Sequence, residues 1–393
     1  MIKLIAKLKT RRSLMRTLSN YMFFLFIFQL AVNAAVLRAS SLKQPFINKA
    51  EERDYWPTTA WRTALLSAHG LDESLLNQLV DKITSGDPYR AIHSLLIVKN
   101  GYLVFEKYFA GYDKDDLHTL QSVTKSIAST LVGAAIQNGF IQSLDQKVLS
   151  FFPEYETVAN LDENKRVMNL RHALTMQTGM AWFGEKHLGP LNRFSGDKMK
   201  FVLDYEMDRP PGEKWYYNSG IAVLLGGLLQ NATGMGTIEF ADKFLFQPLG
   251  VSERRWYSHR GIPHSGGGLH LRPRDMTKIG FLFLNDGAWD GKRILPEGWV
   301  EEATQRHVPF AEKKSEYTAA YGYMWWVLPY ERHNLDKREK QDFFAAYGYM
   351  GQFIFVIPEH DMVVVVTGGA QRWPDEIRPF DFLYRFILKA VEQ

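Results

Sequence analysis

The sequence has no cysteine among its 393 residues. This absence excludes disulfide bonds, a thiolate nucleophile and any zinc site with cysteine ligands. No H-E-x-x-H motif occurs, and the eleven histidines show no spacing typical of a zinc site. No G-x-S-x-G motif is present, which argues against the nucleophile elbow of an α/β-hydrolase. We expect neither a metal nor an organic cofactor.

An excess of positive charge is also lacking outside the amino terminus. Removing residues 1–37, a stretch with six cations and no acidic residue, takes the formal net charge from +4 to −2. The net positive charge of the chain therefore comes from its first residues. It gives no argument for nucleic-acid binding, and we expect no nucleic-acid partner.

An apolar run follows these cations over residues 21–37. A positively charged region before an apolar one is typical of an export signal, and small residues such as Ala34 and Ala39 fit a cleavage site. The run is also close to the length of about 20 residues that a membrane-spanning helix needs. Residues 1–39 are thus interpreted as a signal peptide or a membrane anchor, with a buried helix as a third interpretation. We expect an exported, periplasmic or extracytoplasmic protein, free or tethered to the inner membrane through residues 21–37.

The rest of the chain alternates between segments with the residue pattern of strands and segments with that of helices. β-Rich runs on either side of Asn100-Gly101 predict a hairpin, because Asn-Gly favours a two-residue turn. Apolar residues at helical spacing follow Ser122 and end at Asn138-Gly139. Further helices are expected at Leu71–Ile83, Ile221–Leu229, Asp275–Asn285 and Phe380–Val391, and strands at Tyr323–Val327, Gln352–Ile357 and Met362–Thr367.

This order predicts an α+β fold, in which helices flank an antiparallel β-sheet and a helical lobe is inserted. Residues 40–393 would form one hydrolase domain. Its sheet lobe would span about 40–142 and 266–393, and its helical lobe about 143–265.

Ser122-Val123-Thr124-Lys125 is the first candidate for chemistry. Residues three apart on a helix have Cβ atoms about 5–6 Å apart, so the serine and the lysine can meet. A serine hydroxyl attacks a carbonyl only when a base takes its proton. Lysine serves as that base when burial or a neighbouring cation lowers its pKa from about 10.4. The alternative is an ordinary capped helix start, because S-x-x-K is a loose pattern.

A tyrosine loop is the second candidate. Pro211-Gly212 predicts a turn, and Asn218 or Ser219 is a suitable cap for the helix that follows. A tyrosine on such a loop can present its phenol to a cleft and transfer protons there. The alternative is that the aromatic residues at 215–217 pack beneath the turn.

With these two segments the sequence resembles the β-lactamase-related serine hydrolases, which include class C β-lactamases, D,D-carboxypeptidases, esterases and amidases. Three more segments match in order: Leu174–Gly179, Gly266–Gly280 and Gly351–Pro358. The resemblance implies a β-lactamase/transpeptidase-like fold. The residues it implies are Ser122 as nucleophile, Lys125 and Tyr217 as proton-transfer pair, and Asn218, Ser219, Gly351 and Gln352 near the substrate.

Two departures from the family pattern matter. Reading Tyr216-Tyr217-Asn218 as Y-x-N would make Tyr216 the catalytic tyrosine, whereas the spacing from Pro211-Gly212 favours Tyr217. The third motif, a lysine or histidine before Gly351, is replaced by Phe343–Met350, which has no cation. His264-Ser265-Gly266 has the residue types of this third motif but lies too early in the chain.

β-Lactamases use the third-motif cation to hold a substrate carboxylate. Its absence argues against a dedicated β-lactamase and leaves the strand half of the oxyanion hole to a backbone N–H near Ala345–Gly348. We expect a serine hydrolase that cleaves a small-molecule or peptide ester or amide through an acyl-enzyme. The alternatives are a non-catalytic peptide- or peptidoglycan-binding module and, third, a scaffold anchored by its amino terminus.

Overall fold

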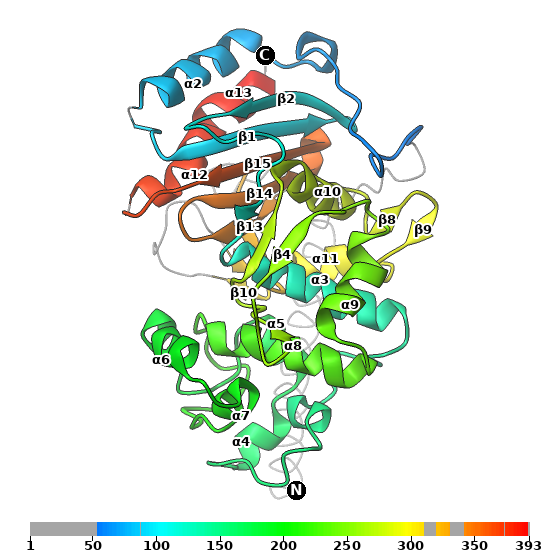
Figure 1. Ribbon diagram of the computed structural model, residues 1–393, viewed down its shortest axis with the longest axis vertical. Coiled ribbons are helices and arrows are strands. Elements are labelled where there is room, and N and C mark those ends of the chain that lie inside the picture. Colours follow the sequence, from blue (N-terminus) through cyan, green and yellow to red (C-terminus); the bar gives the residue numbers. More distant parts are fainter. Residues whose placement is uncertain (1–52, 87, 310–319, 331–341, 373, 392–393) are drawn as a thin grey trace, which may run out of the picture. The chain divides into compact units, whose positions relative to one another are not determined.

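An eight-stranded antiparallel sheet organises the structure, in the order β10-β11-β12-β13-β14-β15-β1-β2 (Figure 1). The computed structural model describes residues 53–86, 88–309, 320–330, 342–372 and 374–391, which all belong to one unit, Ile47–Gln393. The strands are β1 Ile92–Lys99, β2 Tyr102–Tyr108, β10 Val308–Pro309, β11 Ala320–Tyr321, β12 Trp326–Leu328, β13 Phe343–Gly348, β14 Gln352–Ile357 and β15 Met362–Gly368. The first and last thirds of the chain therefore build one sheet.

The hairpin expected at Asn100-Gly101 is confirmed. Both turn residues have positive φ, 51° at Asn100 and 84° at Gly101, as a two-residue turn of this kind requires. The strands β1 and β2 pair antiparallel across it, and β1 pairs with β15 on its other edge. The strands predicted at Gln352–Ile357 and Met362–Thr367 are also confirmed, as β14 and β15.

Helices cover both faces of the sheet (Figure 1). One face packs against α2 (Glu73–Ser85) and the carboxy-terminal helices α12 (Arg378–Phe382) and α13 (Leu388–Val391), which a π-helical turn connects. The other face packs against α10 (Pro273–Leu284) and α3 (Val123–Gln137). Apolar side chains from the sheet and the first helix layer form a continuous core, including Leu79, Leu95, Phe355, Val364 and Leu383. The α+β fold with flanking helices is thereby confirmed.

Residues 143–265 form mostly short helices and loops. The helices are α4 Glu163–Val167, α5 Leu170–Leu174, α6 Leu188–Arg193, α7 Lys198–Leu203, α8 Ser219–Thr233 and α9 Thr237–Ala241. Small strands also occur here, and β4 (Arg254–Trp256) joins β7 (Leu269–Leu271) and β3 (His118–Thr119) in a three-stranded sheet. The division of residues 40–393 into a sheet lobe and a helical lobe stays a prediction.

One predicted strand is wrong. Tyr323–Val327 is not continuous, because Met324 has a φ of 59°, which extended backbone does not allow. The chain turns there instead, and the Gly322 amide donates to the Trp325 carbonyl at 2.8 Å. The two short strands β11 and β12 lie on either side of this turn and pair with each other.

Residues 21–37 lie outside the described residues. Within the described part of the chain, no single helix has the length and apolarity to cross a membrane. The pair Ser219–Thr233 and Thr237–Phe246 meets the criterion together, by length and composition only, with a bend of 82° between its helices.

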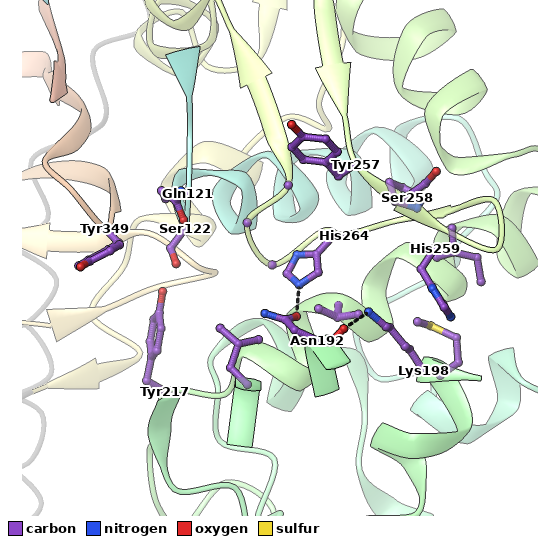
Figure 2. A pocket seen from close by; sticks show the side chains of 18 of the residues that line it. Gln121, Ser122, Asn192, Lys198, Tyr217, Tyr257, Ser258, His259, His264 and Tyr349 are labelled. Atoms are coloured by element: carbon purple, nitrogen blue, oxygen red, sulfur yellow. Dashed lines mark hydrogen bonds between the residues drawn. The ribbon is translucent and has the colours of Figure 1, made fainter. Parts of the chain in front are cut away.

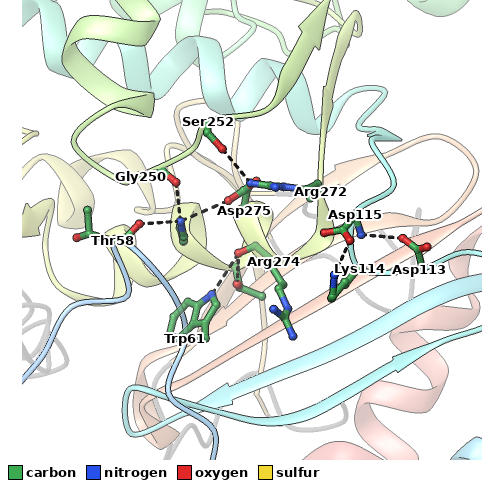
Figure 3. A network of polar contacts seen from close by, with 12 residues as sticks. Thr58, Trp61, Asp113, Lys114, Asp115, Gly250, Ser252, Arg272, Arg274 and Asp275 are labelled. Carbon is green, nitrogen blue, oxygen red and sulfur yellow. Dashed lines mark hydrogen bonds and ion pairs between the residues drawn. The ribbon is translucent and has the colours of Figure 1, made fainter.

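The first two turns of α10 are held by contacts with the loop before β4 and with Thr58 (Figure 3). The Lys278 ammonium donates to the carbonyls of Gly250 at 2.8 Å and Thr58 at 3.3 Å, and lies 3.4 Å from the Asp275 carboxylate. Arg272 pairs with the same carboxylate at 2.8 Å. Burial lowers the pKa of Lys278. These two motif residues, Asp275 and Lys278, therefore hold helix α10 in place.

Replacing Asp275 by alanine should lower the free energy of unfolding by about 3 kcal/mol, because a buried ammonium then loses its carboxylate. Chemical denaturation followed by circular dichroism measures the change. Lys107→Ala on the exposed edge of β2 is the control and should change stability by less than about 0.5 kcal/mol. A loss below about 1 kcal/mol in Asp275→Ala would show that this ion pair does not fasten the helix.

Candidate active site

Ser122 and Lys125 are in direct contact. The Lys125 ammonium Nζ donates to Ser122 Oγ at 2.7 Å and to the Gly266 carbonyl at 2.7 Å. Ser122 is the N-cap residue of α3, yet its side chain makes no capping hydrogen bond. The lysine is only 2% exposed, so the contact lies in a largely dehydrated place. The S-x-x-K pattern here brings a serine hydroxyl and a buried amine together.

Tyr217 completes this group. The Lys125 Nζ lies 4.9 Å from the centroid of the Tyr217 ring. Figure 2 shows the phenol of Tyr217 pointing toward Ser122 from the opposite wall. Tyr216 packs elsewhere, with its ring edge-on to Phe183 at 5.2 Å and beneath the Lys214 ammonium. The geometry therefore brings Tyr217, and not Tyr216, to the serine–lysine pair.

The turn Leu174–Gly179 holds the tyrosine loop. The Met176 carbonyl accepts a hydrogen bond from the Tyr216 amide at 3.1 Å, and the Gln177 carbonyl accepts one from Gly212 at 2.8 Å. The Gln177 side chain returns a bond to the Gly212 carbonyl at 2.9 Å. The Leu174–Gly179 turn thus contacts the backbone at both ends of the tyrosine loop and fixes its position.

The end of strand β13 closes against the Ser122 backbone. A Cβ atom on Gly348 would lie 3.0 Å from the Ser122 nitrogen and 2.4 Å from the Leu120 carbonyl oxygen, so only glycine fits this approach. Within the described residues, the amides of Ser122 and of Tyr349, the next residue after the strand, donate to no backbone oxygen. Neither of these two N–H groups is therefore used by a described backbone hydrogen bond.

These residues face a cavity of about 1140 Å³. Ser122, Tyr217, Gly266 and Tyr349 line it, and so do residues from α6, α7 and the loop before β7. The lining includes Trp215, Tyr257, His259, His264, Trp326, Tyr347 and Glu376. A cavity of this size accommodates a ligand considerably larger than acetate.

His264 also lines this cavity, although it does not occupy the position of a third motif. Its Nε2 lies 3.0 Å from Asn192 Oδ1 (Figure 2). Burial, with a contribution from the Lys125 charge, lowers the pKa of His264 to about 4. A neutral imidazole near neutral pH cannot replace the missing cation.

The four residues expected near the substrate are buried and do not line the cavity. Asn218 caps α8, where its Oδ1 accepts from the Ile221 amide at 2.9 Å. The Gln352 side chain donates to the carbonyls of Gly368 at 2.7 Å and Tyr349 at 3.2 Å. The observed contacts of Asn218 and Gln352 are structural, and substrate binding by Asn218, Ser219, Gly351 and Gln352 stays a prediction.

Sequence patterns did not reveal several residues of the cavity wall. Trp326, Tyr347 and Tyr349 come from β12 and from the end of β13, and Glu376 from the short turn Asp375–Ile377. No local motif marks Glu376, because only folding brings this distant segment to the serine. The cation-free stretch Phe343–Met350 was the one signal that this end of the cavity is unusual.

Comparison with known proteins agrees with this geometry. The family model for beta-lactamase matches residues 80–379, which is most of the chain. The chain belongs to the beta-lactamase family. As a member of this family with hydrolases and esterases among its relatives, it is a serine hydrolase.

Two curated relatives are enzymes. The 6-aminohexanoate-dimer hydrolase of Paenarthrobacter ureafaciens is 26% identical over 305 residues, covering 72% of this chain and 73% of that protein. Esterase EstB of Burkholderia gladioli is 28% identical over 184 residues, covering 42% of this chain and 46% of that protein.

Solved structures share the beta-lactamase family fold. The beta-lactamase/D-alanine carboxypeptidase of Yersinia pestis aligns with a TM-score of 0.63 at 17% identity, covering 81% of this chain and 100% of that one. The octameric penicillin-binding protein homologue of Pyrococcus abyssi aligns with a TM-score of 0.62 at 18% identity, covering 80% and 77% of the two chains. The expected β-lactamase/transpeptidase-like fold is confirmed.

Proposed function

We propose that this serine hydrolase cleaves an ester or amide bond through an acyl-enzyme on Ser122. The observation that carries the proposal is the 2.7 Å contact between Lys125 Nζ and Ser122 Oγ at the wall of the cavity. A hydroxyl in contact with a buried amine has its proton acceptor in place before the substrate arrives, once that amine is neutral. The free serine hydroxyl of a binding module would have no need of such a partner.

In the acylation step, Ser122 Oγ attacks the carbonyl carbon and its proton moves to the Lys125–Tyr217 pair. The bond to the leaving group then breaks, and the phenol of Tyr217 returns a proton to the leaving oxygen or nitrogen. Tyr217 suits this role because its phenol points toward Ser122 (Figure 2) and its ring lies beside Lys125. Water next attacks the acyl-enzyme, and the same pair transfers the protons in the opposite direction.

The oxyanion of the tetrahedral intermediate needs two donors near the serine. The Ser122 amide is one of them, at the N-terminus of α3. The Tyr349 amide is the other, one residue beyond the expected stretch Ala345–Gly348, because Gly348 brings this end of β13 against Ser122. Backbone donors of this kind are held in place by the fold and do not reorganise during the reaction.

Ester or amide substrates without a carboxylate next to the scissile bond suit this site best. Strand β13 offers no cation to hold such a carboxylate. One relative is named as a 6-aminohexanoate-dimer hydrolase and another as an esterase, and these names support amide or ester hydrolysis here. We further propose that the enzyme acts outside the cytoplasm, since residues 21–37 have the composition of an export signal or anchor.

Replacing Ser122 by alanine should abolish covalent labelling by a fluorophosphonate probe, because the probe phosphonylates an activated serine. In-gel fluorescence measures the labelling, and an unchanged circular dichroism spectrum shows that the variant is folded. Ser126→Ala, one turn further along α3, is the control and should keep the label. Persistent labelling of Ser122→Ala would show that another residue is the nucleophile.

The neighbouring tyrosines provide a matched pair of variants. Tyr217→Phe should lower kcat for p-nitrophenyl butyrate by about 10²–10³-fold, because it removes the phenol that transfers the proton. Tyr216→Phe removes a phenol from the same loop outside the cavity and should leave kcat within about twofold. Steady-state kinetics of both variants measure the difference. An equal fall in kcat in both variants would mean that the substitutions only disturb the conformation of the loop.

A further inference from the structure

A carboxylate lies in the same cavity as the catalytic serine. Glu376 comes from the short turn Asp375–Ile377 and lines the cavity together with Ser122 and Tyr217. It is half-buried, and its Oε1 accepts a hydrogen bond from the Tyr347 phenol. The proposed acylation mechanism has no step for this group.

No cation neutralises Glu376 within the part of the chain that the structure describes. The nearby arginines pair with its neighbour instead: Arg90 lies 3.5 Å and Arg378 lies 3.9 Å from the Asp375 carboxylate. Burial raises the pKa of Glu376, and the Tyr347 bond offsets part of that change. A half-buried carboxylate with a phenol as its only described partner is stabilised when a cation enters the cavity beside it.

Aromatic side chains continue along the cavity wall from Tyr347, the partner of this carboxylate. The rings of Tyr217 and Trp326 lie nearly parallel with centroids 6.1 Å apart, and the Trp326 and Tyr347 rings meet at 6.2 Å. Trp215 packs beside both Tyr217 and Trp326, at 6.1 and 6.0 Å. We call these four residues the aromatic wall. The faces of such rings attract an ammonium group, and aromatic cages are a common way to bind one.

The charge at this end of the cavity is therefore the reverse of the family pattern. Strand β13 carries Phe343–Gly348, without a lysine or histidine, and Glu376 contacts it through Tyr347. A substrate carboxylate placed here would meet a like charge. A cationic amine would meet a carboxylate and the aromatic wall together.

We propose that Glu376 and the aromatic wall form a subsite for a cationic amine of the substrate. This inference rests on the proposed function and narrows it to esters or amides that carry an ammonium group within reach of the scissile carbonyl. The subsite lies beside Tyr217, so the cation binds close to the reacting bond. Glu376 is a specificity-determining residue in this account and takes no part in proton transfer.

A pair of esters with matched shape tests the subsite. The p-nitrophenyl ester of 4-(trimethylammonio)butyrate carries a permanent cation, and that of 5,5-dimethylhexanoate is its uncharged carbon isostere. The wild-type enzyme should prefer the cationic ester about tenfold in kcat/KM, which corresponds to about 1.4 kcal/mol. A second pair, butyrylthiocholine and 3,3-dimethylbutyl thiobutyrate, places the charge on the leaving group. At least one pair should show the preference.

Glu376→Gln removes the charge and keeps an oxygen that accepts a hydrogen bond from Tyr347. The ratio of kcat/KM for the cationic ester to that for the neutral ester should therefore fall to about one. Asp375→Asn makes the same change in the adjacent residue, which does not line the cavity, and should keep the preference. If Glu376→Gln lowered kcat/KM equally for the cationic and the neutral ester, the role of Glu376 would be structural and the subsite would be overturned.

The outcomes separate the two proposals. Equal turnover of the cationic and neutral esters in both pairs by the wild-type enzyme would overturn the subsite and leave the serine hydrolase mechanism intact. Failure of the wild-type enzyme to cleave any of these esters, together with no fluorophosphonate labelling of Ser122, would overturn the proposed mechanism, and the subsite would fall with it.

Discussion

The burial of Lys125 is the constraint on which the site depends. An ammonium group that is 2% exposed is stable only where its protons find acceptors. Ser122 Oγ and the Gly266 carbonyl supply them at 2.7 Å each, and the Tyr217 ring lies beside the amine. The same contacts place a hydroxyl, an amine and a phenol around one point. The contacts that satisfy the buried lysine are therefore the same contacts that arrange the catalytic groups.

Segments far apart in the chain meet around that lysine. Helix α3 carries the serine and the lysine, and it packs against β13 on one side and α8 on another. The loop before α8 brings Tyr217, held by the turn at Met176 and Gln177. The close approach of Gly348 brings the end of β13 to the serine amide. Each of these elements is thus held beside the lysine by its own packing and hydrogen bonds.

Sequence patterns predicted those elements whose formation depends on residues that are neighbours in the chain. The Asn100-Gly101 turn, the helix after Ser122 and the strand at Gln352–Ile357 depend on neighbouring residues, and all three are confirmed. The strand at Tyr323–Val327 failed because the positive φ of Met324 has no marker such as glycine. Glu376 was missed because its position in the cavity depends on tertiary contacts, including the bond to Tyr347. Motif spacing indicated Tyr217, and the geometry places it beside Lys125.

The account is tested most directly by the acylation rate of Ser122 when Lys125 is replaced by methionine, which keeps much of the side-chain volume and removes the amine. Stopped-flow release of p-nitrophenol from p-nitrophenyl butyrate, with mass spectrometry of the trapped acyl-enzyme, measures that rate. The account predicts a fall of about 10²–10⁴-fold in a variant that remains folded. An acylation rate within a few-fold of the wild-type value would contradict it, because the buried lysine would then be structural only.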